Sequence, residues 1–279
     1  MTDRYAVVGN PVAHSLSPDI HRAFAQQTGE NIDYSRIIVP AGQFNEVARL
    51  FFNRGGRGLN ITVPCKGDAY QFADKLTAFA SRAQAVNTLA LDTAGLLTGD
   101  NTDGRGLVAD LVDNLGWPIA DKRLLILGAG GAVRGVLQPL LEQGPRELVI
   151  ANRTPTKAAD LADQFTDLGA VTGGGYDDLL EQAPFDLIIN ATSASLAGDL
   201  PPVPKRIVDG NTRCYDMMYA AQPTVFMTWC REQQCREAID GLGMLVEQAA
   251  LAFALWRGKQ PATTSVIESI RALLAGKPS

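Results

Sequence analysis

Residues 124–132 read Leu124-Leu125-Ile126-Leu127-Gly128-Ala129-Gly130-Gly131-Ala132. The four apolar residues predict a buried strand, and the glycines that follow predict a tight turn into a helix. Such a turn brings backbone N–H groups and a helix N-terminus against a pyrophosphate, because glycine lets the backbone approach closely. The motif alone is a weak signal, since Val133 stands where the usual dinucleotide fingerprint has glycine or alanine.

The next predicted strand indicates which dinucleotide is bound. Residues 148–151 are apolar and run into Asn152-Arg153-Thr154, and Lys157 follows one turn later. A site for NAD normally has Asp or Glu there, whereas a cation suits the 2′-phosphate of NADP. Arginine offers a planar donor fork to phosphate, and the threonine hydroxyl equally fits a helix N-cap. The segment predicts NADP over NAD.

Working outward, short apolar runs alternate with helical periods, which predicts parallel sheets with crossover helices. The main expected strands are residues 6–8, 37–39, 58–61, 86–91, 96–97, 124–127, 148–151, 170–172, 185–190 and 214–217. The main expected helices lie from 17, at 43–53, 68–76, 108–115, from 131, from 155, at 177–182, 242–256 and 266–274. A length of 279 residues suits two domains, and the helix after Asp103 marks the best boundary between them.

The composition is that of a globular protein with a slight acidic excess. Hydrophobic residues make up 46% and charged residues 20% of the chain, and the net charge is −5 with a pI near 5.1. Little basic surface is left to neutralise a phosphate backbone, so nucleic acid is not an expected partner. The longest apolar run, Ala249 to Trp256, is shorter than the about 20 residues that cross a bilayer, so a membrane is not expected either.

Few side chains suit a metal or a disulfide. The chain has two histidines and four cysteines, which are Cys65, Cys214, Cys230 and Cys235. Their scattered spacing matches no zinc motif, so no metal site is expected. The first residues show neither the basic nor the apolar segment of a secretion signal, which predicts a cytoplasmic protein with free thiols.

Polar residues gather where strands of the first hundred residues give way to loops. Ser15 and Ser17 open a helix, and two hydroxyls there suit a carboxylate because the helix N-terminus supplies positive potential. Ser17 equally fits a plain N-cap.

Further along, alternation puts Asn60, Thr62 and Lys66 toward one side of a strand end. Asn87 and the run at residues 99–104 add polar groups at other strand ends. Together these segments predict a site for a small polar substrate.

Taken together, these segments and several others resemble the shikimate dehydrogenase family over nearly the whole length of the chain. The matching segments are Gly9-Asn10-Pro11 with His14-Ser15-x-Ser17-Pro18, Asn60-x-Thr62-x-Pro64-x-Lys66, Ala85-Val86-Asn87-Thr88, residues 99–104, Gly128 to Ala132, Asn152-Arg153-Thr154, Asn190-Ala191-Thr192-Ser193, Tyr215-Asp216-Met217 and residues 240–248. They occur in the family's order, which makes the resemblance far more specific than the glycine turn. Cys65 and Gly67-Asp68 depart from the family's usual residues without removing a catalytic group.

The resemblance implies an α/β fold of two domains. An N-terminal substrate domain would span residues 1–103, completed by C-terminal helices within 240–279, and a Rossmann-like NADP-binding domain would span 104–239. The active site would lie in the cleft between them. The implied reaction is the NADPH-dependent, reversible reduction of 3-dehydroshikimate to shikimate, a step toward chorismate and the aromatic amino acids.

The resemblance also assigns roles to single residues. Ser15 and Ser17 would hold the substrate carboxylate, and the ring hydroxyls would be bound or oriented by Asn60, Thr62, Asn87, Asp103, Tyr215 and Gln248. Lys66 and Asp103 would form the catalytic pair. The residues that would bind NADP are Gly128, Ala129, Gly130, Gly131, Ala132, Asn152, Arg153, Thr154, Lys157, Thr192, Met217 and Gly241.

The chemistry fits that pair. Hydride transfer to a carbonyl carbon leaves an alkoxide that must gain a proton, which requires a positioned acid. The ammonium of Lys66 can donate this proton, and Asp103 would orient it. The sequence leaves open whether the lysine alone or the pair exchanges the proton.

Three alternatives stay open. A quinate/shikimate dehydrogenase of broader specificity shares the substrate motifs, although Arg153 argues against the NAD that such an enzyme would use. A catalytically silent nucleotide or metabolite sensor could keep the same fold, but it would not need Lys66 and Asp103. A monomer and a homodimer fit the sequence equally well.

Overall fold

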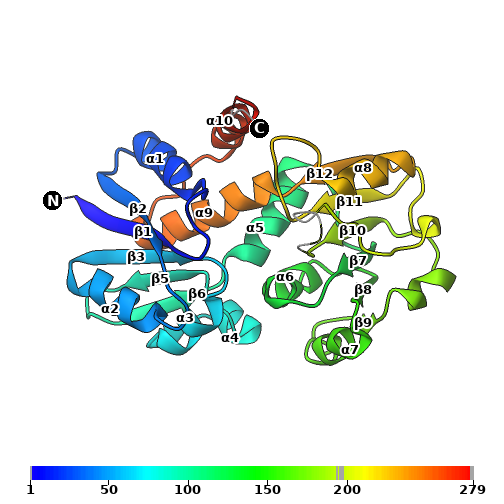
Figure 1. Cartoon of the computed structure of the whole chain (residues 1–279), viewed down its shortest axis with the longest axis horizontal. Coiled ribbons are helices and arrows are strands. Elements are labelled where there is room, and N and C mark those ends of the chain that lie inside the picture. Colours follow the sequence, from blue (N-terminus) through cyan, green and yellow to red (C-terminus); the bar gives the residue numbers. More distant parts are fainter. Residues whose placement is uncertain (1, 193, 195–197, 277–279) are drawn as a thin grey trace. The chain divides into compact units, whose positions relative to one another are not determined.

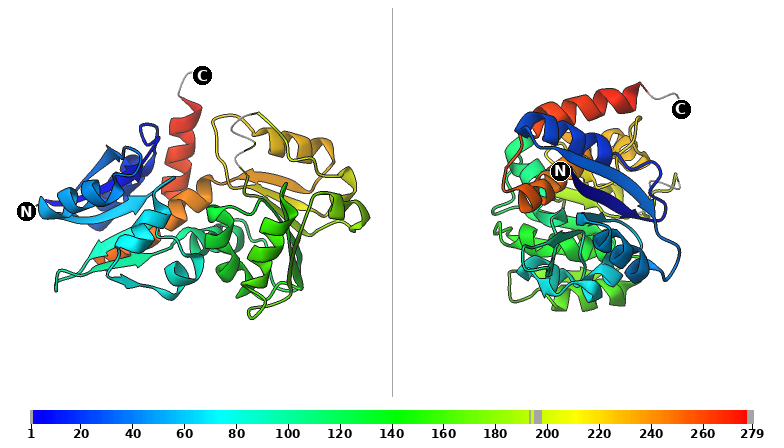
Figure 2. Two further views of the ribbon diagram at one scale, coloured as in Figure 1. Left: turned by 60° about the horizontal axis from the view of Figure 1, so that its bottom comes forward. Right: turned by 90° about the vertical axis from the view of Figure 1, so that its left-hand side faces the viewer.

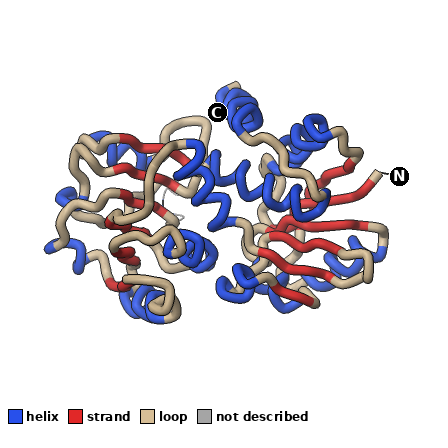
Figure 3. The backbone as a smooth tube through the Cα atoms, turned by 180° about the vertical axis from the view of Figure 1, so that it is seen from behind, coloured by secondary structure: helices blue, strands red, loops and turns tan. Residues whose placement is uncertain are grey.

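A computed structural model describes residues 2–192, 194 and 198–276 and divides the chain into two compact units. The first runs from the N-terminus to Gly106 and also contains Leu245–Ala272, and the second contains Leu107–Met244 and the residues from Leu273 onward. Each unit is built on a sheet of six strands with helices packed against it, so the expected α/β class is confirmed (Figures 1 and 3). The unit boundaries fall within helices, a few residues after the expected positions 103 and 239.

The first unit has a mixed sheet with the strand order β2-β1-β3-β5-β6-β4. Its elements are β1 (Asp3–Gly9), α1 (Ser17–Thr28), β2 (Ile32–Ile38), α2 (Phe44–Asn53), β3 (Gly56–Ile61), α3 (Lys66–Phe72), β4 (Lys75–Leu76), α4 (Ala78–Ala83), β5 (Thr88–Leu91), β6 (Leu97–Asp100), the start of α5 (Asp103–Ala109), most of α9 (Leu242–Arg257) and α10 (Thr264–Ala275). Strand β1 runs parallel to β2 and β3, and β5 runs antiparallel to β3 and β6. The hairpin expected around residues 92–95 is therefore present.

Alternation along the strands of this sheet decides which helices cover each face. Ala6 and Val8 of β1 point into a core with Phe44 of α2, on the face that α2, α3 and α4 cover (Figure 1). Tyr5, which directly precedes Ala6 and so points to the other face, stacks on Trp256 of α9 with ring centroids 4.6 Å apart. The opposite face is therefore covered by α9 together with α1.

The second unit has a wholly parallel sheet with the strand order β12-β11-β10-β7-β8-β9. Its elements are β7 (Arg123–Leu127), α6 (Gly131–Leu141), β8 (Glu147–Ala151), α7 (Pro155–Asp163), β9 (Val171–Gly174), a 3₁₀ turn (Asp177–Glu181), β10 (Leu187–Asn190), a 3₁₀ turn (Lys205–Ile207), β11 (Arg213–Asp216), α8 (Val225–Glu232) and β12 (Glu237–Asp240), preceded by a π-helical turn (Asp110–Asn114) that continues α5. If β7 to β12 are numbered 1 to 6 along the chain, their spatial order across the sheet is 3-2-1-4-5-6, which is the arrangement of dinucleotide-binding Rossmann sheets. Helices cover both faces, α6 and α7 on one and α8 on the other (Figure 2).

Several segments differ from the sequence expectation, among them α4 and β4, which it did not include. The helix expected at residues 68–76 ends at Phe72, because Asp74 instead exchanges hydrogen bonds with Leu97 and leads into β4. Helix α8 and strand β12 were not expected. The short β12 has a charged residue at each end and shows little hydrophobic alternation, so its pairing with β11 rather than its sequence pattern defines it.

Within the described ranges, no helix has both the length and the apolar character needed to cross a membrane. No group of three or more His, Cys, Asp or Glu side chains among those residues is placed to hold a metal ion. The four cysteines form no disulfide with one another.

A buried histidine lies where α1 and α9 meet the first sheet. The His21 ring stacks on Tyr34 at 4.3 Å between centroids and lies 5.2 Å from the Trp256 ring. Its Nε2 lies 3.0 Å from Asn60 Oδ1, and its Nδ1 is buried without a hydrogen-bond partner. An amide oxygen only accepts, so Nε2 carries the proton. Burial lowers the pKa of His21 to about 3, which keeps the ring neutral.

This burial predicts a loss of stability in mild acid. The unfolded chain takes up a proton at His21 below pH 6.5 that the folded chain takes up only near pH 3. Stability therefore falls as the pH drops below 6.5, by up to about 2 kcal/mol near pH 5. We expect His21→Gln, which keeps an N–H donor for Asn60, to lose this component of the pH dependence.

The measurement is urea unfolding at about pH 5 and about pH 7.5. His14→Gln, at the exposed second histidine, is the matched control and should keep the wild-type difference between the two pH values. If His21→Gln also keeps that difference, His21 is not the group responsible.

Candidate active site

A lysine and an aspartate form an ion pair within the first unit. Lys66 is the first residue of α3 and Asp103 the first of α5. Lys66 Nζ donates to Asp103 Oδ2 over 2.6 Å, and the two side chains are 23% and 11% exposed. The pair is thus mostly shielded from water yet reachable by a small molecule. The two residues predicted as a catalytic pair are therefore in contact, and their catalytic role stays a prediction.

Asn87 holds the other oxygen of the same carboxylate. Its Nδ2 donates to Asp103 Oδ1 over 2.7 Å and to Thr102 Oγ1 over 2.8 Å. Its Oδ1 accepts the backbone N–H of Thr102 over 2.9 Å. Both oxygens of Asp103 therefore have a donor, which fixes the plane of the carboxylate and with it the position of the lysine ammonium.

Gln248 of α9 belongs to the same group of polar side chains. Its Oε1 lies 3.3 Å from Asn87 Nδ2, and its Nε2 donates to the Leu245 carbonyl over 2.7 Å. Gly106 allows α5 to pack this close to α9. A Cβ at position 106 would lie 2.6 Å from the backbone nitrogen of Gln248. A side chain at position 106 would push α5 and α9 apart within the first unit.

Asn60 lies deeper in the same network and is only 6% exposed. Its Oδ1 accepts from Tyr34 over 2.7 Å and its Nδ2 donates to Thr88 over 3.2 Å. Thr88 in turn donates to Asn87 over 2.9 Å. A continuous chain of hydrogen bonds thus connects the aromatic cluster around His21 with the ion pair. Both polar atoms of the Asn60 amide are hydrogen-bonded to other side chains, so Asn60 is placed to orient Tyr34 and Thr88.

The two serines lie side by side at the start of α1. Ser15 Oγ donates to Ser17 Oγ over 3.1 Å, and Ser15 is partly exposed. The helix N-cap is Leu16, so the alternative that Ser17 is simply the N-cap is wrong. Arg36 donates to the Ser15 carbonyl over 2.9 Å and lies beside the hydroxyls, while its charge is partly balanced by Asp19 at 3.7 Å. Thr62, half-buried after β3, packs against Gly9, where a Cβ would overlap the threonine methyl group.

The glycine turn of the second unit suits a pyrophosphate. Gly128 has φ +110°, which favours glycine, and a Cβ there would press on Thr192 at 3.3 Å. The N-cap of α6 is Gly130, which has no side chain to cap the first amides of the helix. Gly130, Gly131 and Ala132 are all exposed. Half-buried Ala129 lies between the two glycines. The amides at the start of this 11-residue helix are therefore available to an anion.

The end of β8 presents unpaired cations. Arg153 and Lys157 are exposed, and neither has an ion-pair partner within the described part of the chain. Thr154 is the N-cap of α7 but its hydroxyl makes no capping hydrogen bond, so capping does not occupy it. Asn152 donates to the Thr154 carbonyl over 3.0 Å and shapes the turn. This donor set fits a phosphate monoester on a ribose.

Three predicted coenzyme residues follow the carboxyl ends of β10, β11 and β12. Thr192 donates from its nitrogen and hydroxyl to Asn190 Oδ1, over 3.1 Å and 2.7 Å. The Met217 nitrogen donates to the Asn190 carbonyl over 2.9 Å. Gly241 packs directly against the Met217 carbonyl, which leaves no room for a Cβ. Ser193, the last residue of the matching segment, lies outside the described residues.

Tyr215 is not at this surface, which corrects the sequence expectation. It lies within β11 and is fully buried, its hydroxyl donating to Asp110 over 2.6 Å and accepting from the Met244 nitrogen over 3.3 Å. Tyr219, which the sequence analysis passed over, is partly exposed just after the carboxyl end of β11. Its position in the sequence could have identified it, because ligands of open sheets bind beyond the strand ends and Tyr219 follows the expected strand at residues 214–217. Burial raises the pKa of Tyr219, so its phenol remains a donor at neutral pH.

Three family models match successive segments of this chain. Residues 7–89 match the family described as "Shikimate dehydrogenase substrate binding domain", residues 110–197 match "Shikimate / quinate 5-dehydrogenase", and residues 241–271 match "Shikimate 5'-dehydrogenase C-terminal domain". A shikimate dehydrogenase (NADP(+)) of Cellvibrio japonicus is 54% identical over 277 residues, covering 99% of this chain and 100% of the relative.

Solved structures are similar over nearly the same length. The Ael1 enzyme from Pseudomonas putida has a TM-score of 0.90 at 45% identity and covers 96% of this chain and 98% of its own. The shikimate 5-dehydrogenase of Thermus thermophilus, solved with NADP(H) and shikimate, has a TM-score of 0.86 at 32% identity, covering 98% of this chain and 100% of its own. This chain belongs to the shikimate dehydrogenase family.

Proposed function

We propose that this protein catalyses the NADPH-dependent, reversible reduction of 3-dehydroshikimate to shikimate. The observation that carries the proposal is the Lys66–Asp103 ion pair, 2.6 Å long, whose carboxylate is held on its other side by Asn87. A sensor would have no use for a lysine fixed in this way. The names of relatives at about half identity, which specify shikimate and NADP(+), support the substrate and the coenzyme.

The proton step follows from the geometry of the pair. When bound, NADPH supplies a hydride to the carbonyl carbon of the substrate. The Lys66 ammonium donates a proton to the oxygen of that carbon as it becomes an alcohol, and in the reverse direction the neutral amine accepts it. Asp103 and Asn87 hold the ammonium in place and reduce its freedom to rotate away.

Substrate recognition uses the remaining polar groups of the first unit. Ser15 and Ser17 hold the carboxylate beside the positive start of α1, with Arg36 nearby. Thr62, Asn87 and Gln248 bind or orient the ring hydroxyls, and Asn60 acts through Thr88 on Asn87. Tyr219 replaces Tyr215 as the tyrosine available to a ligand.

Coenzyme binding uses the second unit. The turn from Gly128 to Ala132 holds the pyrophosphate, while Asn152, Arg153, Thr154 and Lys157 hold the 2′-phosphate. Thr192, Met217 and Gly241 flank the nicotinamide end at the neighbouring strand ends. Arg153 favours NADP and so argues against the broader quinate/shikimate enzyme. We place the reaction in the cytoplasm, where four free thiols are stable.

The role of the lysine predicts a selective loss of turnover. We expect Lys66→Met to lower kcat for NADPH oxidation with 3-dehydroshikimate by about 10²- to 10⁴-fold, because the acid that protonates the new alcohol is gone. Shikimate binding, measured by calorimetry, should remain within about tenfold of wild type. Lys75→Met is the matched control, since Lys75 is an exposed lysine of the same unit, paired with Asp92 at 3.7 Å. Wild-type turnover in Lys66→Met would disprove the role.

The role of the arginine predicts a change in coenzyme preference. We expect Arg153→Gln to raise KM for NADP⁺ about 10- to 100-fold, because charge-assisted bonds to the 2′-phosphate are lost. The KM for NAD⁺, which has no such phosphate, should stay unchanged. Arg206→Gln, at an exposed arginine of the same unit, should leave both values as in the wild type. An equal rise for both coenzymes in Arg153→Gln would indicate a general structural defect.

A further inference from the structure

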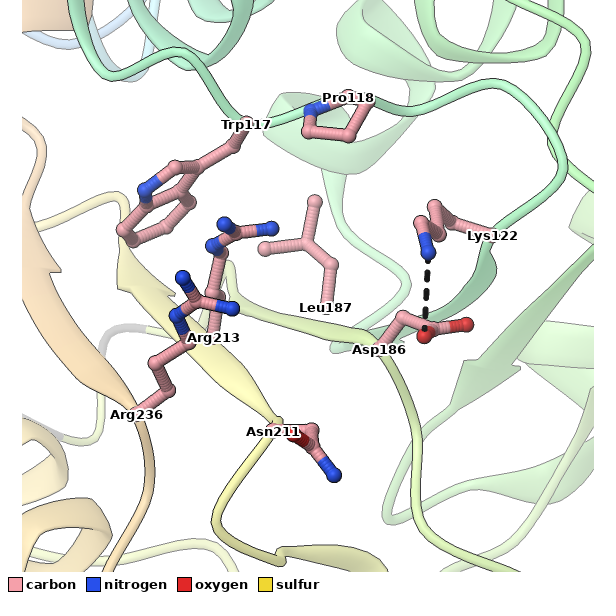
Figure 4. Close-up of a pocket in the computed structure, with 8 residues that line it drawn as sticks. All are labelled: Trp117, Pro118, Lys122, Asp186, Leu187, Asn211, Arg213 and Arg236. Atoms are coloured by element: carbon pink, nitrogen blue, oxygen red, sulfur yellow. Dashed lines mark ion pairs between the residues drawn. The ribbon is translucent and has the colours of Figure 1, made fainter.

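A cavity of about 290 Å³ lies in the second unit at the amino ends of its strands (Figure 4). Its lining residues precede or begin β7, β10, β11 and β12. The carboxyl ends of the same four strands lead into the proposed coenzyme residues. Strands of four or five residues separate the two edges by about 15 Å, so the cavity is not part of the coenzyme site.

The charges around this cavity do not balance. Lys122, Arg213 and Arg236 line it with one carboxylate, Asp186. When the ion-pair partners Arg146 and Glu237 are included, four cations face two carboxylates, which leaves a net charge of +2. Asp186 is already paired with Lys122 at 3.7 Å, as the dashed line in Figure 4 marks. The side chain of the exposed Arg236 has no hydrogen bond or ion pair with any described residue.

Among the described residues, Arg213 also lacks hydrogen-bond acceptors for its guanidinium group. Its Nε is buried without a hydrogen-bond acceptor, and the nearby Glu237 Oε2 lies 3.9 Å away, too far for such a bond. That carboxylate oxygen instead accepts from Trp117 Nε1 over 3.0 Å. The guanidinium is therefore incompletely paired, and its two terminal nitrogens, which make no hydrogen bond with a described residue, remain as donors for an oxyanion bound in the cavity.

The walls of the cavity add an apolar surface next to the cations. Arg213 lies over the Trp117 ring, 5.7 Å from its centroid, and Leu187 and Pro118 line the space beside it. Trp117 and Leu187 are each 2% exposed and belong to the main core of this unit, so these walls are rigid. The volume lies at the small end of the range for small-molecule sites and is far below what a macromolecular partner needs.

We propose that this cavity binds a phosphate dianion, either free or carried by a small organic molecule. Arg213 and Arg236 hold the phosphate oxygens, since guanidinium forks match that geometry and the net charge of +2 matches a dianion. An organic phosphate would place its carbon atoms against Trp117 and Leu187. The site is independent of the reaction proposed above.

Calorimetric titration of the full chain tests this proposal, with inorganic phosphate and phenyl phosphate as probes. The buffer contains saturating NADP⁺, which covers the other phosphate-binding region, at constant ionic strength. We expect saturable binding of at least one probe to the wild type, weakened at least about tenfold in Arg236→Gln. Arg236 is exposed, so this variant should fold. Tighter binding of phenyl phosphate would identify an organic phosphate as the ligand, and equal binding would identify free phosphate.

Two controls locate the anion. Arg206→Gln removes the same charge from the same unit outside the cavity and should bind as the wild type does. The second control repeats the wild-type titration without NADP⁺. If binding seen without NADP⁺ disappears when NADP⁺ is saturating, or if Arg236→Gln leaves binding unchanged, the anion does not occupy this cavity and the proposal fails. Absence of saturable binding of either probe to the wild type would overturn it as well.

Discussion

The carboxylate of Asp103 is the constraint on which the candidate site depends. Lys66 occupies one of its oxygens and Asn87 the other, and Asn87 is in turn tied to Thr102 and Gln248. A half-buried ion pair costs desolvation unless each partner is fully hydrogen-bonded. Lys66 and Asn87 meet that requirement for the carboxylate, and the partly exposed ammonium keeps further N–H donors for water or a ligand. The same bonds that make the pair affordable to bury therefore also orient its proton.

This arrangement needs a scaffold that brings distant segments together. Lys66 follows β3, Asn87 precedes β5, Asp103 follows β6 and Gln248 comes from α9. The mixed sheet places β3, β5 and β6 next to one another, so their ends converge. Glycine at position 106 then allows α5 to approach the backbone of α9 at Gln248. Backbone sterics, rather than any direct chemical role, require this glycine.

The second unit organises its functional groups by sheet polarity. Every strand of its sheet runs in the same direction, so the glycine turn, Thr192, Met217 and Gly241 all lie at the carboxyl edge. Asp216 supports that edge from within, since it is buried and accepts hydrogen bonds from Asn190, Thr224 and the Met218 nitrogen. The opposite edge carries the arginines and the cavity. One sheet thus offers two chemically different edges.

Much of this protein is determined by its sequence alone. The strand and glycine turn at residues 124–132 and the cation after β8 are local patterns whose chemistry does not depend on distant contacts. The sequence also named Lys66 and Asp103 through their family motifs, but their meeting depends on the sheet that brings the ends of β3 and β6 together. The tertiary structure decided which of two nearby tyrosines is accessible, burying Tyr215 against Asp110 and leaving Tyr219 partly exposed. It also decided that Asn60 orients other groups, and it created β12 by pairing with β11. These features depend on burial and on partners far along the chain, which a local pattern of residue types does not encode.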